Sequence, residues 1–218
     1  MAANPAVQRA ESYRADEVFA TAEILLRSIS FPLTLRLPKP LNNDQLLEFC
    51  AANDLFRIER NPAGEVILMT PAGGKNGKGE LYIGRELDNW VELHLGLAFG
   101  PNTGFSLPDG SVRAPDAAWL SSEKWNSLTS AEQEKFIPFC PELIVELRSP
   151  NDSLTELEQK MDDWIANGAQ LAWLIDPLRK LAMIYRPGQE PETLLQPELL
   201  HGEGPIAGFT LKMQRPWD

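Results

Sequence analysis

A single glutamate in an otherwise apolar segment constrains this chain more than any other feature. The segment from Leu143 to Leu147 reads LIVEL, and Glu146 is its only polar residue. A nearly continuous apolar run of this length is typical of a strand that is buried on both faces of a sheet. Burying a lone carboxylate costs several kcal/mol unless a cation or strong donors compensate it. We therefore expect Glu146 to have a positively charged partner in the folded protein.

Two kinds of partner for Glu146 fit the sequence. Asp116 follows a proline at the start of a second probable strand, and a divalent metal ion held by Asp116, Glu146 and the backbone carbonyl of Leu147 would supply the charge. Mg²⁺ prefers such hard oxygen ligands. Alternatively, Glu146 forms a structural ion pair with Arg148 or Arg113, because alternation puts Glu146 and Arg148 on one strand face. Spacing alone leaves both partners open.

The residues around this strand predict a mixed α/β domain. A helix is expected from Asn42 or Asn43, followed by a β-hairpin in LFRIERNPAGEVILM and a helix over residues 80–94. The segment 97–121 predicts short strands joined by a Pro-Asp-Gly turn, and a polar helix is expected over 123–135. Ser153 and Glu156 form a capping box that opens a helix to about Asn167. Strands in LAWLIDP and LAMIYRPG and a short terminal hairpin complete the pattern.

Two further segments, at the N-terminus and before the helix predicted over residues 80–94, each allow more than one interpretation. Residues 1–30 contain an amphipathic helical pattern, which we interpret as an appended arm or a partner contact, and alternating leucines predict a strand from Leu33. The segment TPAGGKNGKGE predicts a glycine-rich loop. Its backbone amides with Lys75 and Lys78 could bind an anion, or it is a simple connector. It lacks the G-x-x-x-x-G-K-[ST] pattern of nucleotide-hydrolysing loops.

Composition excludes several classes of function. The 218 residues include 31 acidic and 20 basic side chains, which gives a net charge of −11. This charge argues against a protein that binds nucleic acid through bulk positive charge. It does not argue against an acidic site that reaches phosphate through a divalent cation. Cys50 and Cys140 match no CxxC pattern, and His94 and His201 are too separated for an imidazole-rich metal site. No apolar run is long enough for a membrane span, and we expect a cytoplasmic protein in a reducing compartment.

Lys160 is a candidate for a third functional residue. It lies on the helix predicted after Glu146, fourteen residues further along the chain. The alternative is a surface ion pair with Glu156 four residues earlier on the same helix, which would contribute only a few tenths of a kcal/mol. Spacing does not decide between these two roles.

Three separate motifs together resemble a known family. The runs SVRAPDAAWLSSEKW, CPELIVELRSPNDSLTELEQKMDDWIANGAQLAWLIDP and YRPG followed by GFTLKM resemble the Uma-two-type family of putative restriction endonucleases, within the PD-(D/E)XK nuclease superfamily. The resemblance covers about residues 33–218. It implies a restriction-endonuclease-like core, with a central mixed β-sheet flanked by helices, and it divides the chain into an N-terminal helical arm (1–32) and one nuclease domain (33–218).

The resemblance also assigns roles to particular residues. Asp116 matches the acid of the Pro-Asp motif and Glu146 the second acid. The usual lysine position, two residues after the second acid, holds Arg148, and the lysine is instead matched by Lys160 on the following helix. Arginine stays protonated, so it can stabilise an anion but cannot act as a base. The first helix of the superfamily often adds an acid, for which Glu80 and Glu86 are the candidates.

These roles imply a Mg²⁺- or Mn²⁺-dependent endonuclease that hydrolyses phosphodiester bonds of DNA. Asp116, Glu146 and the Leu147 carbonyl would hold the metal, and Lys160 would orient water and the scissile phosphate. A homodimer is implied, since two sites then act on two strands. The alternative is a nuclease-fold protein with weak or no catalysis that serves as a binding or regulatory module, which the arginine at position 148 and the acidity favour.

Overall fold

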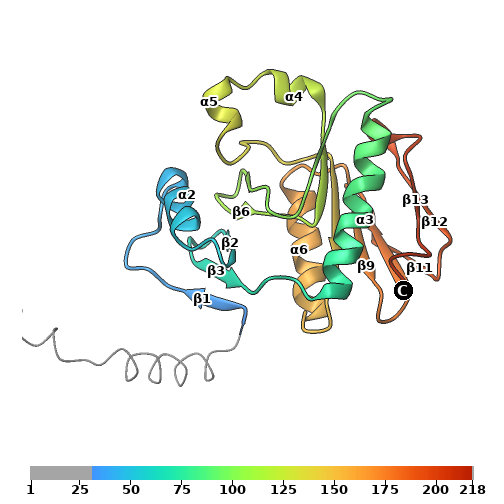
Figure 1. The fold of residues 1–218 in the computed structure, drawn as a ribbon, viewed down its shortest axis with the longest axis horizontal. Coiled ribbons are helices and arrows are strands. Elements are labelled where there is room, and N and C mark those ends of the chain that lie inside the picture. Colours follow the sequence, from blue (N-terminus) through green and yellow to red (C-terminus); the bar gives the residue numbers. More distant parts are fainter. Residues whose placement is uncertain (1–30, 218) are drawn as a thin grey trace, which may run out of the picture.

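A mixed β-sheet forms the centre of the molecule in the computed structural model, which describes residues 31–217 (Figure 1). Its six strands lie in the order β11-β10-β9-β8-β7-β4. β8 and β9 are parallel and the other neighbouring pairs are antiparallel. The strands are β4 (Leu97–Phe99), β7 (Ala117–Leu120), β8 (Leu143–Leu147), β9 (Leu171–Asp176), β10 (Leu181–Tyr185) and β11 (Glu192–Leu195).

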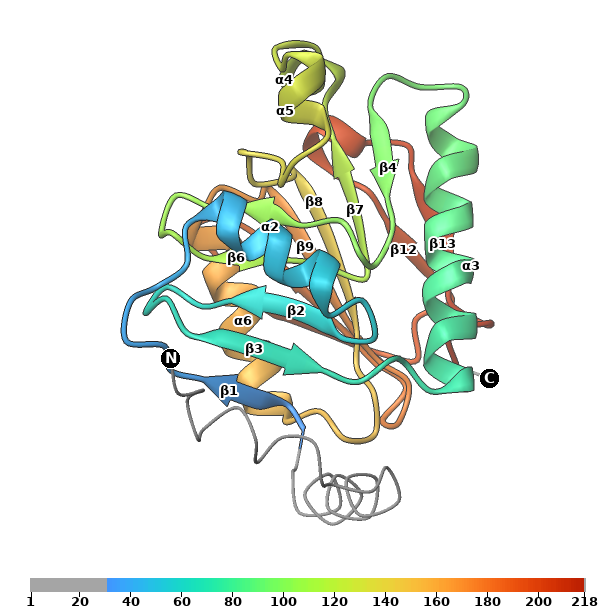
Figure 2. The same cartoon turned by 60° about the vertical axis from the view of Figure 1, so that its left-hand side comes forward.

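Two long helices cover opposite faces of this sheet. Helix α3 (Gly74–Val91) packs against β4, β7 and β8, and helix α6 (Leu154–Ala166) packs against β9 and β10 (Figures 1 and 2). All residues of β8 are buried, as the sequence predicted. Val145 belongs to the core that includes side chains of α3, whereas Ile144 packs with Met161 and Trp164 of α6. By alternation, the side chain of Glu146 lies on the α6 side of the sheet.

A smaller sheet lies beside the central one and is the left-hand part of Figure 1. Its strands have the order β1-β3-β2-β6-β5, and helix α2 (Asn43–Ala52) packs on it through the buried Leu46. The predicted hairpin is confirmed as the antiparallel pair of β2 and β3. The strands are β1 (Leu33–Leu35), β2 (Arg57–Arg60), β3 (Val66–Met69), β5 (Phe105–Ser106) and β6 (Val112–Arg113).

The C-terminal segment forms the predicted hairpin beside α3. Strands β12 (Leu199–His201) and β13 (Thr210–Lys212) pair antiparallel, with the short helix η1 (Gly204–Ile206) between them. None of the helices within residues 31–217 is both long and apolar enough to cross a membrane. The fold is therefore the expected mixed α/β arrangement, with a central mixed sheet flanked by helices. The helical pattern predicted within residues 1–30 lies outside the described residues.

Two predicted elements differ from the structure. Helix α3 begins at Gly74 and ends at Val91, so most of the predicted glycine-rich loop is helical and only a short piece before Gly74 is not. Close packing accounts for one of the glycines in this helix, because a Cβ at Gly79 would come within 2.5 Å of a methyl carbon of Leu147, whereas a Cβ at Gly74, Gly77 or Gly84 would meet nothing within 4 Å. The polar helix expected over 123–135 is two short helices, α4 (Ser122–Asn126) and α5 (Ser130–Gln133).

Candidate active site

Antiparallel pairing of β7 with β8 places the two predicted acids opposite each other. Ala117 pairs with Val145, so that Asp116 and Glu146 occupy the next position of the same register. Both carboxylates are almost fully buried, with 4% and 3% of their residue surface exposed. The two predicted acids, Asp116 and Glu146, therefore lie next to each other at one end of the β7–β8 pair.

Helix α6 supplies the cation of Glu146. The Nζ of Lys160 lies 2.9 Å from the Oε1 of Glu146, and the indole Nε1 of Trp164 donates a hydrogen bond to the same oxygen over 3.1 Å. Lys160 and Trp164 are four residues apart and thus lie on one helix face. Burial raises the pKa of Glu146, and the charge of Asp116 raises it further, against the opposing effect of Lys160.

Lys160 is shared between two carboxylates. Its Nζ also donates to the Oε1 of Glu59 on β2 over 3.0 Å, and its side chain is 14% exposed. Burial alone would lower the pKa of Lys160, but Glu146 and Glu59 raise it overall. Conversely, burial would raise the pKa of Glu59, but the nearby cations, Lys160 foremost, lower it. Lys160 is therefore a protonated, buried bridge, and the alternative of a surface pair with Glu156 is wrong.

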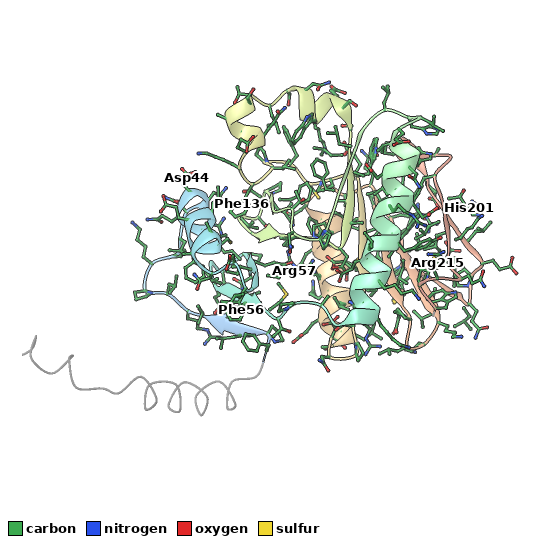
Figure 3. The ribbon with its side chains drawn as sticks, in the orientation of Figure 1. Asp44, Phe56, Arg57, Phe136, His201 and Arg215 are labelled. Atoms are coloured by element: carbon green, nitrogen blue, oxygen red, sulfur yellow. The ribbon has the colours of Figure 1, made fainter. Side chains whose placement is uncertain are left out.

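Asp116 has its own cation, which comes from the smaller sheet. The Nη1 of Arg57 donates to the Oδ1 of Asp116 over 2.7 Å, and the backbone N–H of Leu147 donates to the Oδ2 over 2.7 Å. The Nη2 of Arg57 donates to the carbonyl of Ala114. Figure 3 shows Arg57 at the junction between the smaller sheet and the rest of the molecule. Both oxygens of Asp116 are thus held in place.

Glu80 approaches from α3 and has weaker partners. It is 8% exposed, and its Oε1 lies 3.5 Å from the side-chain amide nitrogen of Asn76. The same nitrogen of Asn76 donates to the backbone carbonyl of Leu147 over 3.2 Å. Burial raises the pKa of Glu80, and Asp116 adds to this rise. Glu86, the other helix candidate, pairs with Arg85 on a partly exposed part of α3 instead.

Neither arginine that the sequence offered is the cation of Glu146. Arg148 pairs with the fully buried Asp176 over 2.6 Å and donates to the carbonyl of Asp152. Arg113 pairs with Asp163 over 2.5 Å. The predicted ion pair of Glu146 with Arg148 or Arg113 is therefore wrong. Arg148 pairs with Asp176 and not with Glu146, the acid two residues before it.

We call the six charged groups at this place the charged cluster. It consists of four buried carboxylates and two cations, which leaves two negative charges in excess, 2 − 4 = −2, and its members are Glu59, Glu80, Asp116, Glu146, Arg57 and Lys160. Among residues 31–217, no group of three acidic, histidine or cysteine side chains is already arranged around a metal position. The donor set nevertheless fits a hard cation. Its oxygens carry excess negative charge, and the pKa of Glu80 and of Glu146 is raised.

Three members of this site were not anticipated from the sequence. Arg57 and Glu59 alternate on one face of β2, and Asn76 lies in the first turn of α3. The run FRIER contained a signal, because Arg57 and Glu59 share one face of a short strand within a hairpin, and charged side chains that become buried have to find partners. The partners of Arg57 and Glu59 depend on how the two sheets pack, and the local sequence does not predict that packing.

Comparisons with known proteins agree with this architecture. The model of the Uma2 family, described as "Putative restriction endonuclease", matches residues 43–214. A crystal structure described as a putative nuclease belonging to DUF820, from Anabaena variabilis, is similar in fold, with a TM-score of 0.64 and 21% sequence identity. The likeness covers 82% of this chain and 98% of that one. No curated protein sequence matches the chain.

Proposed function

The chain belongs to the Uma2 family of putative restriction endonucleases, and from this membership we propose that it is a metal-dependent endonuclease that hydrolyses phosphodiester bonds of DNA. One observation carries the proposal beyond the family. Lys160, which departs from the usual position of the superfamily lysine, has its Nζ 2.9 Å from the Oε1 of Glu146. Together with the register of β7 and β8, which sets Asp116 beside Glu146, this contact supports the proposal in spite of the unusual spacing of the lysine.

The carboxylates would hold Mg²⁺ or Mn²⁺. Asp116, Glu146 and the backbone carbonyl of Leu147 are the ligands we propose, and Glu80 is a further candidate because no cation pairs directly with its carboxylate within residues 31–217. When bound, the ion would neutralise the negative charge that develops on the phosphate and would make water a stronger acid. Burial of the carboxylates excludes bulk water and strengthens these electrostatic effects.

Lys160 would act as a hydrogen-bond donor rather than as a base. Its pKa is raised by the two carboxylates, so the ammonium stays charged at neutral pH. From its position between Glu59 and Glu146 it can donate to a phosphate oxygen and orient the attacking water. Arg148 is engaged by Asp176 and has no role in this proposal.

Cleavage of DNA by the full-length protein tests the proposal. We expect supercoiled plasmid to be cut in the presence of Mg²⁺ or Mn²⁺, and we expect Asp116→Asn and Lys160→Met each to lower the rate at least about 100-fold, since both remove groups that stabilise the transition state. The rates are measured from the loss of supercoiled DNA on gels at several metal concentrations.

Two matched variants control for damage to the fold. Asp176→Asn also removes a buried aspartate paired with an arginine, and Lys124→Met removes a lysine paired with the buried Glu142, but neither lies in the charged cluster. Both should cleave at a rate within a few-fold of the wild type if they fold. Cleavage that is unaffected by Asp116→Asn, or an absence of metal-dependent cleavage on any DNA, would count against the proposal.

Homodimerisation is part of the proposal and stays a prediction. Restriction-type enzymes place one site on each strand through a two-fold axis, and a symmetric dimer is the simplest assembly that does so.

The two cysteines of the described chain, Cys50 and Cys140, are free thiols, which is compatible with the reducing compartment that we expect.

A binding or regulatory module without catalysis is the second candidate function. The observation that favours it is the internal pairing of the site, in which Asp116 and Glu146 each already contact a cation of the chain. Thermal melts discriminate between the two, because a metal ion that binds only the folded protein raises its melting temperature. A melting temperature that does not change with millimolar Mg²⁺ or Mn²⁺ would favour the binding module.

A further inference from the structure

Arg57 occupies an unusual position for a buried arginine. It extends from β2 of the smaller sheet to Asp116 beside β7, and its side chain is 20% exposed. Its Nη1 lies 2.7 Å from the Oδ1 of Asp116, so it lies against a carboxylate that the proposed function assigns to the metal. No other cation of the described chain forms an ion pair with Asp116.

The anchoring of this guanidinium is incomplete. Its Nη1 and Nη2 have acceptors, but its Nε is buried and has no hydrogen-bond partner among residues 31–217. A buried polar group without a partner costs free energy, so this position of Arg57 is held mainly by its attraction to acids. Lys160 differs, because it bridges two carboxylates with two short contacts.

A divalent cation and a guanidinium cannot share one carboxylate without cost. Carboxylate oxygens have free lone pairs, so the ion is not excluded by shape, but two like charges a few ångströms apart in a buried site repel strongly. Each oxygen of Asp116 already accepts one hydrogen bond, the Oδ2 from the Leu147 amide and the Oδ1 from Arg57, and no other cation compensates this carboxylate directly among the described residues. A metal ion at Asp116 therefore approaches the charge of Arg57 directly.

We propose that Arg57 is a built-in counter-cation of Asp116 with which a divalent metal ion has to compete. In the absence of metal, Arg57 neutralises Asp116 and joins the smaller sheet to the central one, and it lowers the affinity of the site for the ion. The location of the metal at Asp116 rests on the proposed function. Arg57 is accordingly a residue that sets metal affinity, and it is distinct from the groups that would act on the phosphate.

Metal binding without DNA tests this role. Mn²⁺ is titrated into full-length wild-type protein and into Arg57→Met, and free Mn²⁺ is measured by electron paramagnetic resonance. We expect Arg57→Met to bind Mn²⁺ at least about tenfold more tightly, because a like charge is removed from the site. We also expect its melting temperature to be lower than that of the wild type without Mn²⁺, and to rise more when Mn²⁺ is added.

Arg113→Met is the matched control. It removes one buried positive charge close to the charged cluster, but from Asp163 instead of Asp116. Its Kd for Mn²⁺ should therefore change less than about threefold. If Arg57→Met does not fold, Arg57→Gln keeps a hydrogen-bond donor without the charge, and the same tightening is expected.

The outcomes separate this inference from the proposed function. A folded Arg57 variant that binds Mn²⁺ no more tightly than a wild type that binds and cleaves would overturn the role of Arg57 and leave the nuclease standing. A wild type that binds no Mn²⁺ beside an Arg57 variant that does would support the role of Arg57 and count against metal-dependent cleavage by the wild type. An equal gain in Arg113→Met would also overturn the inference, since charge near the cluster would then suffice.

Discussion

Glu80 differs from the other acids of the charged cluster because no cation pairs with it directly within the described residues. Its contact with the Asn76 amide is long, at 3.5 Å, and burial together with Asp116 raises its pKa. A carboxyl group with a raised pKa in the folded state binds its proton more tightly there than in the unfolded chain. Its contribution to stability is therefore present below the unfolded pKa, about 4.3, and is lost as the pH rises through the folded pKa.

The raised pKa of Glu80 predicts how the stability of the protein changes when its carboxylate is replaced by an amide. Glu80→Gln should raise the free energy of unfolding of the metal-free protein at pH 7, by at most about 1 kcal/mol because Arg57 and the Asn76 amide offset part of the cost of the charge. It should change the stability little at pH 4, where the carboxyl is largely protonated in both states. Urea unfolding of both proteins at the two pH values measures the difference. A variant that is less stable than the wild type at pH 7 would contradict this account.

The sequence predicted the acids of the site better than their partners. An acid within LIVEL has to be compensated, and this local argument pointed correctly to a cation for Glu146. Which cation it is depends on three-dimensional packing. Arg148 is only two residues away and on the same strand face, but it is taken by Asp176, and Lys160 reaches Glu146 instead. Glu59 lies 101 residues from Lys160, a distance over which spacing carries no information.

At the scale of elements, the contact of α3 with β8 decides where the candidate ligands lie. Gly79 lies in the second turn of α3, and its missing side chain lets the helix approach Leu147 closely. The backbone N–H of Leu147 donates a hydrogen bond to Asp116, and the backbone carbonyl of Leu147 accepts one from Asn76. A shift of Leu147 would therefore move both the first acid and the proposed carbonyl ligand.

A pair of glycine substitutions tests this contact. Gly79→Ala would place its Cβ within 2.5 Å of the Cδ2 of Leu147, so we expect a loss of about 1–3 kcal/mol in the free energy of unfolding. Gly84→Ala is the control in the same helix, because nothing lies within 4 Å of its Cβ, and the better helix propensity of alanine should stabilise it by up to about 1 kcal/mol. Urea midpoints of the two variants should thus move in opposite directions. Equal shifts would show that close packing is not the reason for the glycine.

Element boundaries were predictable where local signals agree with packing. Helix α6 begins after its Ser153 cap and ends before Gly168, which has a φ of +113°, as its capping residues indicated. The start of α3 was not predictable, because glycines argue locally against a helix, and the packing of α3 on the central sheet that favours it is not visible in the local sequence. The strands of the central sheet were clear because apolar runs buried on both faces have few alternatives.

At the scale of the whole molecule, the net charge of −11 opposes binding to DNA. Much of any attraction would have to come from the metal ion, which neutralises the two excess negative charges of the charged cluster. The metal-free protein should consequently have little affinity for duplex DNA at moderate salt.

This expectation can be measured without cleavage. Ca²⁺ binds oxygen ligands, and we expect it to strengthen binding to a fluorescent DNA duplex by more than about tenfold at constant ionic strength, as followed by fluorescence anisotropy. Asp116→Asn should abolish the gain, whereas Asp176→Asn should keep it. Wild-type binding that is equally tight with and without Ca²⁺ would show that another surface of the protein attracts DNA.

The order of the charged cluster along the chain has a consequence during synthesis. Arg57 and Glu59 leave the ribosome first, and Lys160 emerges last, about one hundred residues later. Until helix α6 has formed, Glu59 and Glu146 lack their shared ammonium, and the site is an unfinished set of acids that repel one another. A truncated or still growing chain consequently cannot assemble the site. Under the proposed function, the ability to cut DNA thus arises only after helix α6 has been made and has packed against the sheet.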